Sequence, residues 1–179
     1  MFLNQESNMK GYVHVYTGDG KGKTTAAIGL AVRAAGAGHK VFLAQFVKGG
    51  RYSELNALER FDDLITVEQF GLGRFIKGKP SEMDISAARV GLEKLKIIIT
   101  SGEYKVVVLD EANIALYYNL ISIQELIDLV GSRAEETEII ITGRKAAPEI
   151  LEIADLVTEM REIKHYYNEG VQARIGIEK

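Results

Sequence analysis

Glycine, lysine and threonine residues gather in residues 17–25, which read TGDGKGKTT. Glycines let a backbone turn tightly and approach a ligand, and successive N–H groups at a helix N-terminus attract anions. Lys23 adds a positive charge. Thr24 offers a hydroxyl to a divalent cation, and Thr25 adds another donor. This combination of residue types predicts a loop that binds the phosphate groups of a nucleotide.

The loop departs at one position from the common P-loop pattern, G-x-x-x-x-G-K-[ST]. Gly22, Lys23 and Thr24 supply the end of the pattern, but Thr17 stands where the first glycine is expected. We therefore expect the chain to enter the loop at a different angle and to hold the nucleotide in an unusual pose. The loop residues expected to contact ATP are Gly18, Asp19, Gly20, Lys21, Gly22, Lys23, Thr24 and Thr25.

Two apolar runs are each followed by polar residues that could also take part in binding the phosphate groups of a nucleotide. The run VVVL is followed by Asp110 and Glu111, and the run EIII is followed by Thr142, Gly143 and Arg144. Ligands collect at the carboxyl edge of a parallel sheet. With Thr24, Asp110 and Glu111 are expected to hold Mg²⁺ or Mn²⁺, and Arg144 to contact the phosphate chain. The alternatives are an ordinary solvated strand end and a surface arginine.

The elements that must position these residues follow from the alternation of β-branched runs with helical stretches. We expect strands at Tyr12–Tyr16, Val41–Phe46, Ile65–Phe70, Lys105–Leu109, Glu138–Thr142 and Leu156–Glu159. We expect helices at Lys23–Ala35, Ser53–Phe61, Ser81–Thr100, Ile121–Val130 and Pro148–Ala154. The pattern predicts an α/β fold: a P-loop NTPase-like (RecA-like) three-layer sandwich with a mainly parallel sheet of about six strands. One domain is expected over residues 10–179.

Composition limits the possible partners. The 179 residues include 22 Lys and Arg against 25 Asp and Glu, and there is no long basic run. We therefore expect no nucleic-acid partner. The absence of cysteine excludes disulfides and cysteine-based zinc sites and is compatible with a cytoplasmic location. Residues 1–9 lack the features of a signal peptide and are expected to be a flexible arm, and no run is long enough for a membrane span.

Two segments depart from the alternation of strands and helices: residues 71–80, GLGRFIKGKP, and the tail 164–179, KHYYNEGVQARIGIEK. Long loops at the end of strands commonly carry function. If the tail is a strand, Tyr166 and Tyr167 point to opposite faces, which leaves one of them free for a broad, flat ligand. Phe75 is the aromatic residue of the first segment. We expect the two segments to line one cavity; the alternative is a final structural strand and a surface loop.

The motifs together resemble the P-loop-type corrinoid adenosyltransferases, which act on cob(I)alamin or cob(I)yrinic acid a,c-diamide. The resemblance runs from residue 11 to residue 179 and rests on GDGKGKTTAA, QFVKG, VVVLDE, ITGR and the tail KH…GVQARIGIE. It implies that ATP binds in a reversed orientation, so that the ribose C5′ faces the corrinoid. Co(I) then attacks C5′ and triphosphate leaves as a single group, in the biosynthesis or salvage of adenosylcobalamin.

The resemblance also implies roles for individual residues. Lys23, Thr24 and Glu111 become the expected catalytic residues, and Arg33 and Arg144 match nucleotide-contacting arginines, although spacing alone gives Arg33 no role. The expected corrinoid contacts are Phe75, His165, Tyr166 and Tyr167. A homodimer and a flavoprotein (flavodoxin-like) reductant are further implications. Lys48 lies in the shared QFVKG stretch without an assigned role.

One segment departs from the family pattern. Characterised members read G-E-G followed by aromatic residues that help to displace the lower axial ligand of cobalt, whereas residues 71–76 here read GLGRFI. Two other functions are compatible with the phosphate loop: a P-loop nucleoside kinase, and an ATP-binding switch without catalysis. Kinases of the thymidine kinase type commonly carry a cysteine-rich zinc lobe, which this chain cannot form.

Overall fold

The computed structural model describes residues 10–74, 76 and 78–178. The expected N-terminal arm, residues 1–9, lies outside the described residues, as do Phe75, Lys77 and Lys179. Among the described residues, no helix is long and apolar enough to cross a bilayer.

A single parallel sheet of six strands organises the chain, in the order β3-β2-β4-β5-β1-β6. The strands are β1 (Val13–Thr17), β2 (Val41–Phe46), β3 (Ile65–Phe70), β4 (Val106–Asp110), β5 (Glu138–Thr142) and β6 (Leu156–Glu159). The helices are α1 (Lys23–Gly36), α2 (Ser53–Leu58), α3 (Glu82–Ser101), α4 (Ala112–Tyr117), α5 (Ile123–Gly131) and α6 (Pro148–Glu152). Short 3₁₀ helices cover Glu59–Phe61 and Tyr166–Glu169.

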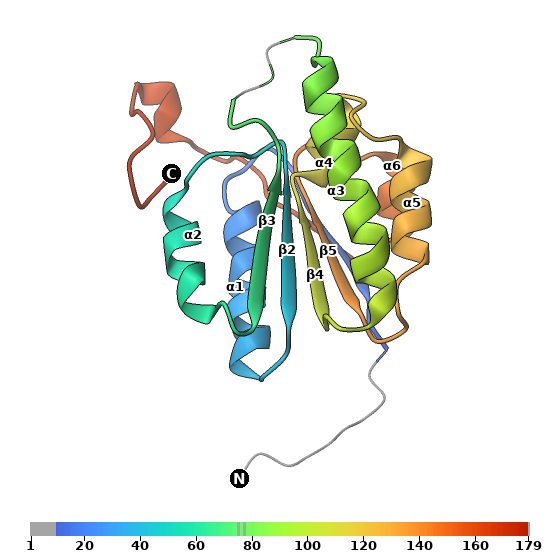
Figure 1. The fold of residues 1–179 in the computed structure, drawn as a ribbon. Coiled ribbons are helices and arrows are strands. Elements are labelled where there is room, and N and C mark those ends of the chain that lie inside the picture. Colours follow the sequence, from blue (N-terminus) through green and yellow to red (C-terminus); the bar gives the residue numbers. More distant parts are fainter. Residues whose placement is uncertain (1–9, 75, 77, 179) are drawn as a thin grey trace.

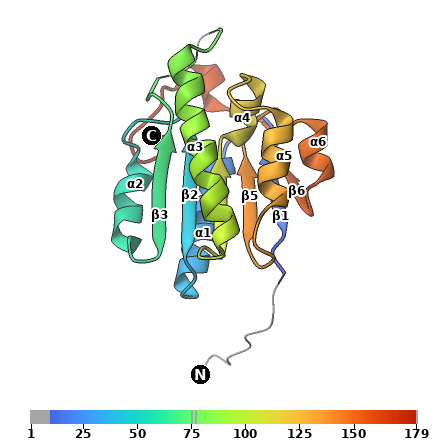
Figure 2. The same cartoon turned by 45° about the vertical axis from the view of Figure 1, so that its right-hand side comes forward.

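Helices cover both faces of the sheet, as the predicted three-layer α/β fold requires (Figures 1 and 2). The sheet has a hydrophobic core on each face. Residues of β2 contribute alternately to the two cores, because successive side chains of a strand point to opposite faces. Val41 and Leu43 pack with α1 and α2, whereas Phe42, Ala44 and Phe46 pack with the core beneath α3, α4 and α5. Every residue of β2 is buried, which explains why this run is apolar without alternation.

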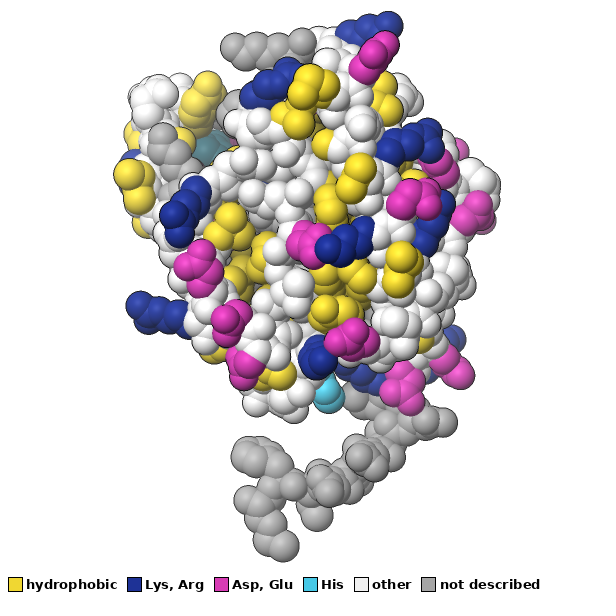
Figure 3. All heavy atoms as spheres, in the orientation of Figure 1, with side chains coloured by type: hydrophobic (Ala, Val, Ile, Leu, Met, Phe, Trp, Pro, Cys, Tyr) yellow, Lys and Arg dark blue, Asp and Glu magenta, His cyan; other side chains and the backbone are white. Residues whose placement is uncertain are grey.

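The strand order places the phosphate loop between two other strand ends. β1 lies between β5 and β6, and β5 lies beside β4. The loop after β1, residues 18–22, therefore meets the ends of β4, β5 and β6 at one edge of the sheet. Figure 3 shows acidic and basic side chains interspersed over α3, without a continuous basic patch on that face.

Apart from four differences, the predicted elements agree with the structure to within one or two residues. The prediction missed α4, which begins directly after Glu111. The predicted helix 53–61 divides into α2 and a 3₁₀ turn, and α6 ends at Glu152 instead of Ala154. The expectation of a strand at the tail tyrosines is wrong: Tyr166 and Tyr167 lie in a 3₁₀ helix, so strand alternation does not decide where they point.

Candidate active site

The phosphate loop is packed against the chain that follows β6. Gly18 and Gly22 have φ values of 92° and 117°, which favour glycine, and a Cβ atom on Gly18 would lie 2.5 Å from the carbonyl oxygen of Met160. The backbone N–H of Gly20 donates to this same carbonyl at 2.6 Å. Gly20 was expected to offer its N–H to phosphate, and in this structure that N–H is already engaged.

Lys23 is held inside the loop. Its ammonium donates to the carbonyl oxygens of Gly18 and Gly20, both at 2.7 Å, and the residue is only 7 % exposed. Burial lowers the pKa of Lys23, and the nearby Arg144 lowers it further, whereas Glu111 and Asp19 oppose the shift. The loop thus fixes a buried cation at the start of α1.

Asp110, at the end of β4, is the centre of a hydrogen-bond network. Its Oδ1 accepts from Thr24 at 2.8 Å and from Thr142 at 2.7 Å. Its Oδ2 accepts from Lys48 at 2.8 Å and from Gln45 at 3.1 Å. The carboxylate is fully buried. With four donors in place, Asp110 is suited to orienting Thr24 and Lys48 more than to binding a metal ion directly.

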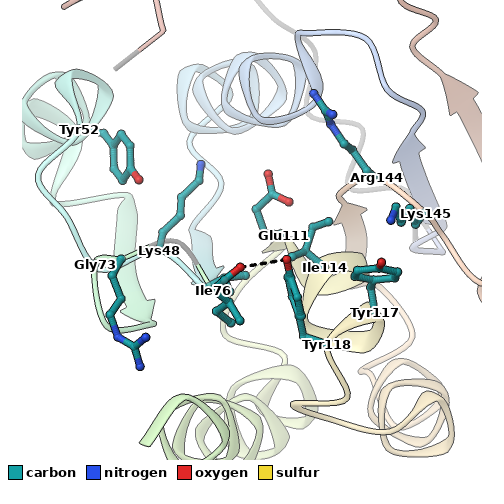
Figure 4. Close-up of a pocket in the computed structure, with 12 residues that line it drawn as sticks. Lys48, Tyr52, Gly73, Ile76, Glu111, Ile114, Tyr117, Tyr118, Arg144 and Lys145 are labelled. Carbon is teal, nitrogen blue, oxygen red and sulfur yellow. Dashed lines mark hydrogen bonds between the residues drawn. The ribbon is translucent and has the colours of Figure 1, made fainter. Parts of the chain in front are cut away.

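Glu111 follows in a left-handed conformation, φ 58°, with its N–H donating to the hydroxyl of Thr142 at 3.0 Å. The turn aims the Glu111 carboxylate into the space between Lys48 and Arg144 (Figure 4). Burial raises the pKa of Glu111, and Asp110 raises it further, against the opposing charges of Lys48, Lys23 and Arg144. An added cation would stabilise the charged form of this carboxylate.

The donor set fits a hard divalent cation that also binds phosphate. In the described part of the chain, no group of three or more His, Cys, Asp or Glu side chains could hold a metal ion. Mg²⁺ does not need such a group, because it usually keeps several waters and binds through one or two protein oxygens together with substrate phosphates. Thr24 and Glu111 line one cavity and supply oxygens of this kind.

The first of two cavities, here the phosphate cavity, has a volume of about 770 Å³. It is lined by residues 20–25 and Ile28 of the loop and α1, by Lys48, Tyr52, Ser53, Glu54, Glu111 and Arg144, and by His165, Gly176, Ile177 and Glu178 of the tail. The tail therefore reaches back across the molecule to the start of α1 (Figure 1).

Lys21 connects the phosphate loop to the tail. Its ammonium donates to the hydroxyl of Tyr166 at 3.2 Å, to the carbonyl of Ile177 at 3.0 Å and to Glu178 at 2.9 Å. Glu178 also accepts from Arg174, and these hydrogen bonds hold the pKa of Glu178 well below its ordinary value. Lys21 was expected to contact ATP, and its charge is here already matched by a carboxylate.

The second cavity, here the aromatic cavity, has a volume of about 570 Å³ (Figure 4). Its lining consists of Val47, Lys48, Tyr52, Gly73, Arg74, Ile76, Glu111, Ile114, Tyr117, Tyr118, Arg144 and Lys145. Both cavities share Lys48, Tyr52, Glu111 and Arg144, so they adjoin at these side chains.

The structure brings most of the predicted site residues together at this edge of the sheet, but not Arg33. Arg33 lies exposed in the last turn of α1 and lines neither cavity. Asp19 is exposed, with an oxygen 3.9 Å from a guanidinium nitrogen of Arg144. Tyr167 is 64 % exposed and lines neither cavity.

The two segments expected to share one cavity line different ones. His165 lines the phosphate cavity, whereas Gly73, Arg74 and Ile76 line the aromatic cavity. The predicted contact Phe75 lies outside the described residues. The tail thus covers the phosphate loop, and Gly73, Arg74 and Ile76 border the other side of the joint site.

Sequence reasoning missed several residues of the site, and each had a weak signal. Gln45 interrupts the apolar run VFLAQF, and Thr142 ends another such run. A polar residue buried in an apolar strand needs a partner, and Asp110 is that partner for both. Tyr117 and Tyr118 were missed together with α4, the helix that carries Tyr117.

Comparison with known proteins identifies the family. The sequence profile described as ATP:corrinoid adenosyltransferase BtuR/CobO/CobP matches residues 9–178. The chain belongs to this family. A corrinoid adenosyltransferase of Escherichia coli K12 is 36 % identical over 97 % of this chain and 88 % of its own length. The corrinoid adenosyltransferase CobA of Salmonella typhimurium is 35 % identical over 97 % and 88 %, respectively. One from Pseudomonas aeruginosa is 32 % identical over 98 % and 87 %.

Within the ATP:corrinoid adenosyltransferase family, this chain combines a phosphate loop with an adjoining aromatic cavity. The matched region includes both cavities and the tail that covers the loop. The part of the chain that matches the family therefore contains the residues that form the candidate site.

Proposed function

We propose that this protein transfers the 5′-deoxyadenosyl group of ATP to the reduced cobalt of a corrinoid and releases triphosphate. The observation that carries the proposal is the junction of the two cavities at Lys48, Tyr52, Glu111 and Arg144. A cavity with a phosphate loop opens there onto one with aromatic walls. Two large substrates can thus meet at one point, as group transfer requires.

The phosphate cavity is the proposed site of the ATP triphosphate. Lys23 is the buried cation at its base, and Thr24 and Thr25 place hydroxyl groups at the start of α1. Lys48 and Arg144 border the junction, where they would face the phosphate oxygens nearest the ribose. If C5′ lies at this junction, the reversed ATP pose that the family resemblance implies follows directly.

The proposed reaction is a single displacement. The electron pair of Co(I) forms the cobalt–carbon bond at C5′ as the C5′–O bond breaks, and triphosphate leaves with the electrons of that bond. No proton is transferred at cobalt, so the step needs no general base. Negative charge grows on the triphosphate, and the fixed cations Lys23, Lys48 and Arg144 stabilise it with little reorganisation.

A divalent cation, Mg²⁺ or Mn²⁺, would neutralise part of the charge on the leaving triphosphate. Thr24 and Glu111 are the residues proposed to hold it. The hydroxyl of Thr24 donates to Asp110 at 2.8 Å and accepts a longer hydrogen bond from Lys48 at 3.4 Å, which leaves one oxygen lone pair for the cation. Asp110 is proposed to act through Thr24, since both of its own oxygens already accept hydrogen bonds.

The aromatic cavity is the proposed corrinoid site, for cob(I)alamin or cob(I)yrinic acid a,c-diamide. Apolar and aromatic surface is the usual lining of a site for a large flat ligand. Tyr52, Tyr117 and Tyr118 provide aromatic surface, and Phe75 adjoins the lining residues Arg74 and Ile76 in sequence. His165 and Tyr166 are reassigned in this proposal to the cover over the phosphate loop. The resemblance also supports, as proposals, a flavoprotein electron donor and a homodimer.

The test is to incubate the protein with ATP, a divalent cation and either corrinoid under a strong reductant, and to follow the products by phosphorus NMR. Triphosphate should appear in equal amount with the adenosylated corrinoid, and neither should form without corrinoid. Release of ADP would identify a kinase. Binding of ATP without any product would identify a nucleotide switch.

A further inference from the structure

One cation of the aromatic cavity lacks a role in the proposed chemistry: Lys145. The other cations are engaged. Lys48 is ion-paired with Asp110 at 2.8 Å, and Arg74 with Asp84 at 2.8 Å. Arg144 belongs to the junction with the phosphate cavity. Among the described residues, no carboxylate lies within ion-pair distance of Lys145.

An aromatic ring holds Lys145 in place. Its ammonium lies 3.7 Å from the centroid of the Tyr117 ring, a cation–π contact. The hydrogen bond and charge of Lys145 also lower the pKa of Tyr117. Figure 4 shows this pair at the side of the cavity opposite Tyr52 and Lys48. The ring fixes the position of the ammonium without neutralising its charge.

The backbone at Lys145 is unfavourable for a residue with a side chain. Its φ of 58° lies in the left-handed region, which glycine adopts without steric cost and in which lysine is strained. The preceding Gly143, with φ 126°, already accommodates the turn after β5. A lysine in this conformation, beside a cavity and without an acidic partner, indicates a function for its charge.

The charges around the cavity define what this cation can bind. Four cations line it, Lys48, Arg74, Arg144 and Lys145, against the single carboxylate of Glu111. The edge of a corrin ring carries acid side chains, which amidation converts into neutral amides. A corrinoid that retains carboxylates presents negative charge at its edge, whereas a fully amidated corrinoid presents none.

We propose that Lys145, held by Tyr117, binds a peripheral carboxylate of the corrinoid and makes the protein selective for incompletely amidated corrinoids. The inference rests on the proposed function and specifies its substrate class. A lysine can donate a hydrogen bond to an amide oxygen as well, so amidated corrinoids remain substrates. A carboxylate also attracts the lysine by its negative charge, so a corrinoid that retains carboxylates binds more tightly than a fully amidated one.

The test compares two base-free corrinoids, cobyrinic acid a,c-diamide and the fully amidated cobinamide, as reduced substrates. The variants are Lys145→Met, which keeps length and removes charge, Lys145→Arg, which keeps charge, and Tyr117→Leu, which removes the ring. Lys96→Met is the control, because it removes the charge of another exposed lysine, which lies on α3 outside both cavities. The measurement is kcat/KM for each corrinoid, with KM for ATP alongside.

The ratio of kcat/KM for the diamide over cobinamide should fall about two- to fivefold in Lys145→Met, the range for an exposed charge pair. Lys145→Arg should retain most of the ratio, and Tyr117→Leu should lower it less than Lys145→Met. High salt should weaken the preference of the wild-type protein. Equal losses for both corrinoids, or an unchanged ratio, would overturn the selectivity but leave the proposed function intact. Absence of transfer to either corrinoid by the wild-type protein would overturn the proposed function itself.

Discussion

The phosphate cavity and the aromatic cavity differ in how their side chains are held. At the phosphate cavity, Lys23 donates to two loop carbonyls, and Asp110 accepts four hydrogen bonds, from β2, the loop after β2, β5 and helix α1. At the aromatic cavity, Tyr118 donates one hydrogen bond to a loop carbonyl, and Tyr117 holds the ammonium of Lys145 through a cation–π contact.

The difference matches the chemistry proposed for each side. Stabilising charge on a leaving group requires dipoles and cations that are already in position, because their reorganisation would add to the barrier. A large flat substrate needs surface and a few orienting contacts, and a loop that can adjust suits its entry. We therefore expect substitutions at the phosphate cavity to have large effects on stability and turnover, and those at the aromatic cavity to have smaller effects confined to the corrinoid.

Asp110→Ala should be the most damaging substitution for stability. It leaves the half-buried ammonium of Lys48 without its carboxylate and removes the acceptor of Thr24, Thr142 and Gln45. Breaking a buried pair in this way costs about 3–5 kcal/mol in the free energy of unfolding, measurable by urea denaturation. Asp84→Ala is the comparison: this carboxylate is also buried, but its partner Arg74 is exposed, and its other hydrogen bonds cap α3 through Ser81, so its loss should cost about 0.5–2 kcal/mol. Equal losses in both variants would contradict a special role for the Asp110 network.

Lys23→Ala should abolish turnover while leaving the fold in place. The loss of a desolvated charge-assisted contact costs about 2–5 kcal/mol, on the order of 30- to several-thousand-fold in kcat/KM for ATP. The control is Lys21→Ala, because Lys21 lies in the same loop but is directed to the tail. We expect its loss to stay within about fivefold, the value of a largely exposed ion pair. Near-normal activity of Lys23→Ala would rule out the phosphate loop as the ATP site.

The strands and the phosphate loop could be predicted from sequence because their signals are local. Buried parallel strands are continuous apolar runs, and a glycine-rich turn before an amphipathic helix has few other uses. The bounds of β2 and β5 agree with the prediction for this reason, and those of β3 and β6 agree as well, although these strands are half-buried and exposed. The helix α4 was missed because it is short and follows a left-handed Glu111, which no local pattern announces.

Contacts between distant segments could not be predicted from sequence. Lys21 and Glu178 are separated by most of the chain, and their ion pair depends on the path of the tail after β6. The segments 71–80 and 164–179 were both predicted to carry function at one cavity, yet the residues of the first that line a cavity belong to the aromatic cavity and those of the second to the phosphate cavity. Arg33 shows the opposite case, because a motif match assigned it to ATP whereas the helix geometry carries it away from both cavities.

Glu111→Gln should separate stability from function at the junction of the cavities. Burial and Asp110 raise the pKa of Glu111 in the folded protein, so folding disfavours the charged carboxylate. The resulting penalty is present above the folded pKa and vanishes as pH falls below the unfolded value, near 4.5. At pH 7 the variant should therefore melt about 2–4 °C above wild type, the shift that ~1 kcal/mol produces in a domain of this size, and the difference should disappear by pH 4.

The same variant should require more divalent cation, by about tenfold in the concentration for half-maximal turnover, because the amide is a weaker ligand than the carboxylate. Glu111→Asp offers a comparison, since it keeps the charge and shortens the side chain. A variant that is less stable than wild type at pH 7, with unchanged cation dependence, would show that Glu111 is a structural residue.

Tyr118→Phe should have the smallest effect, and it tests whether the loop beside the aromatic cavity is set by α4. The hydroxyl of Tyr118 donates to the carbonyl of Ile76 at 3.1 Å, which ties Ile76 to the residue directly after α4. The ring remains in the variant, so the cavity keeps its aromatic wall while the loop loses one anchor. A hydrogen bond of this kind contributes about 0.5–1.5 kcal/mol, so KM for the corrinoid should rise about two- to tenfold. KM for ATP should stay unchanged, because no phosphate-cavity residue contacts the Tyr118 hydroxyl.

Tyr117→Phe, which removes a hydroxyl from the neighbouring ring without touching Ile76, is the control. Equal increases in KM for ATP and the corrinoid would mean that the two cavities are mechanically coupled and that the contrast between them is false.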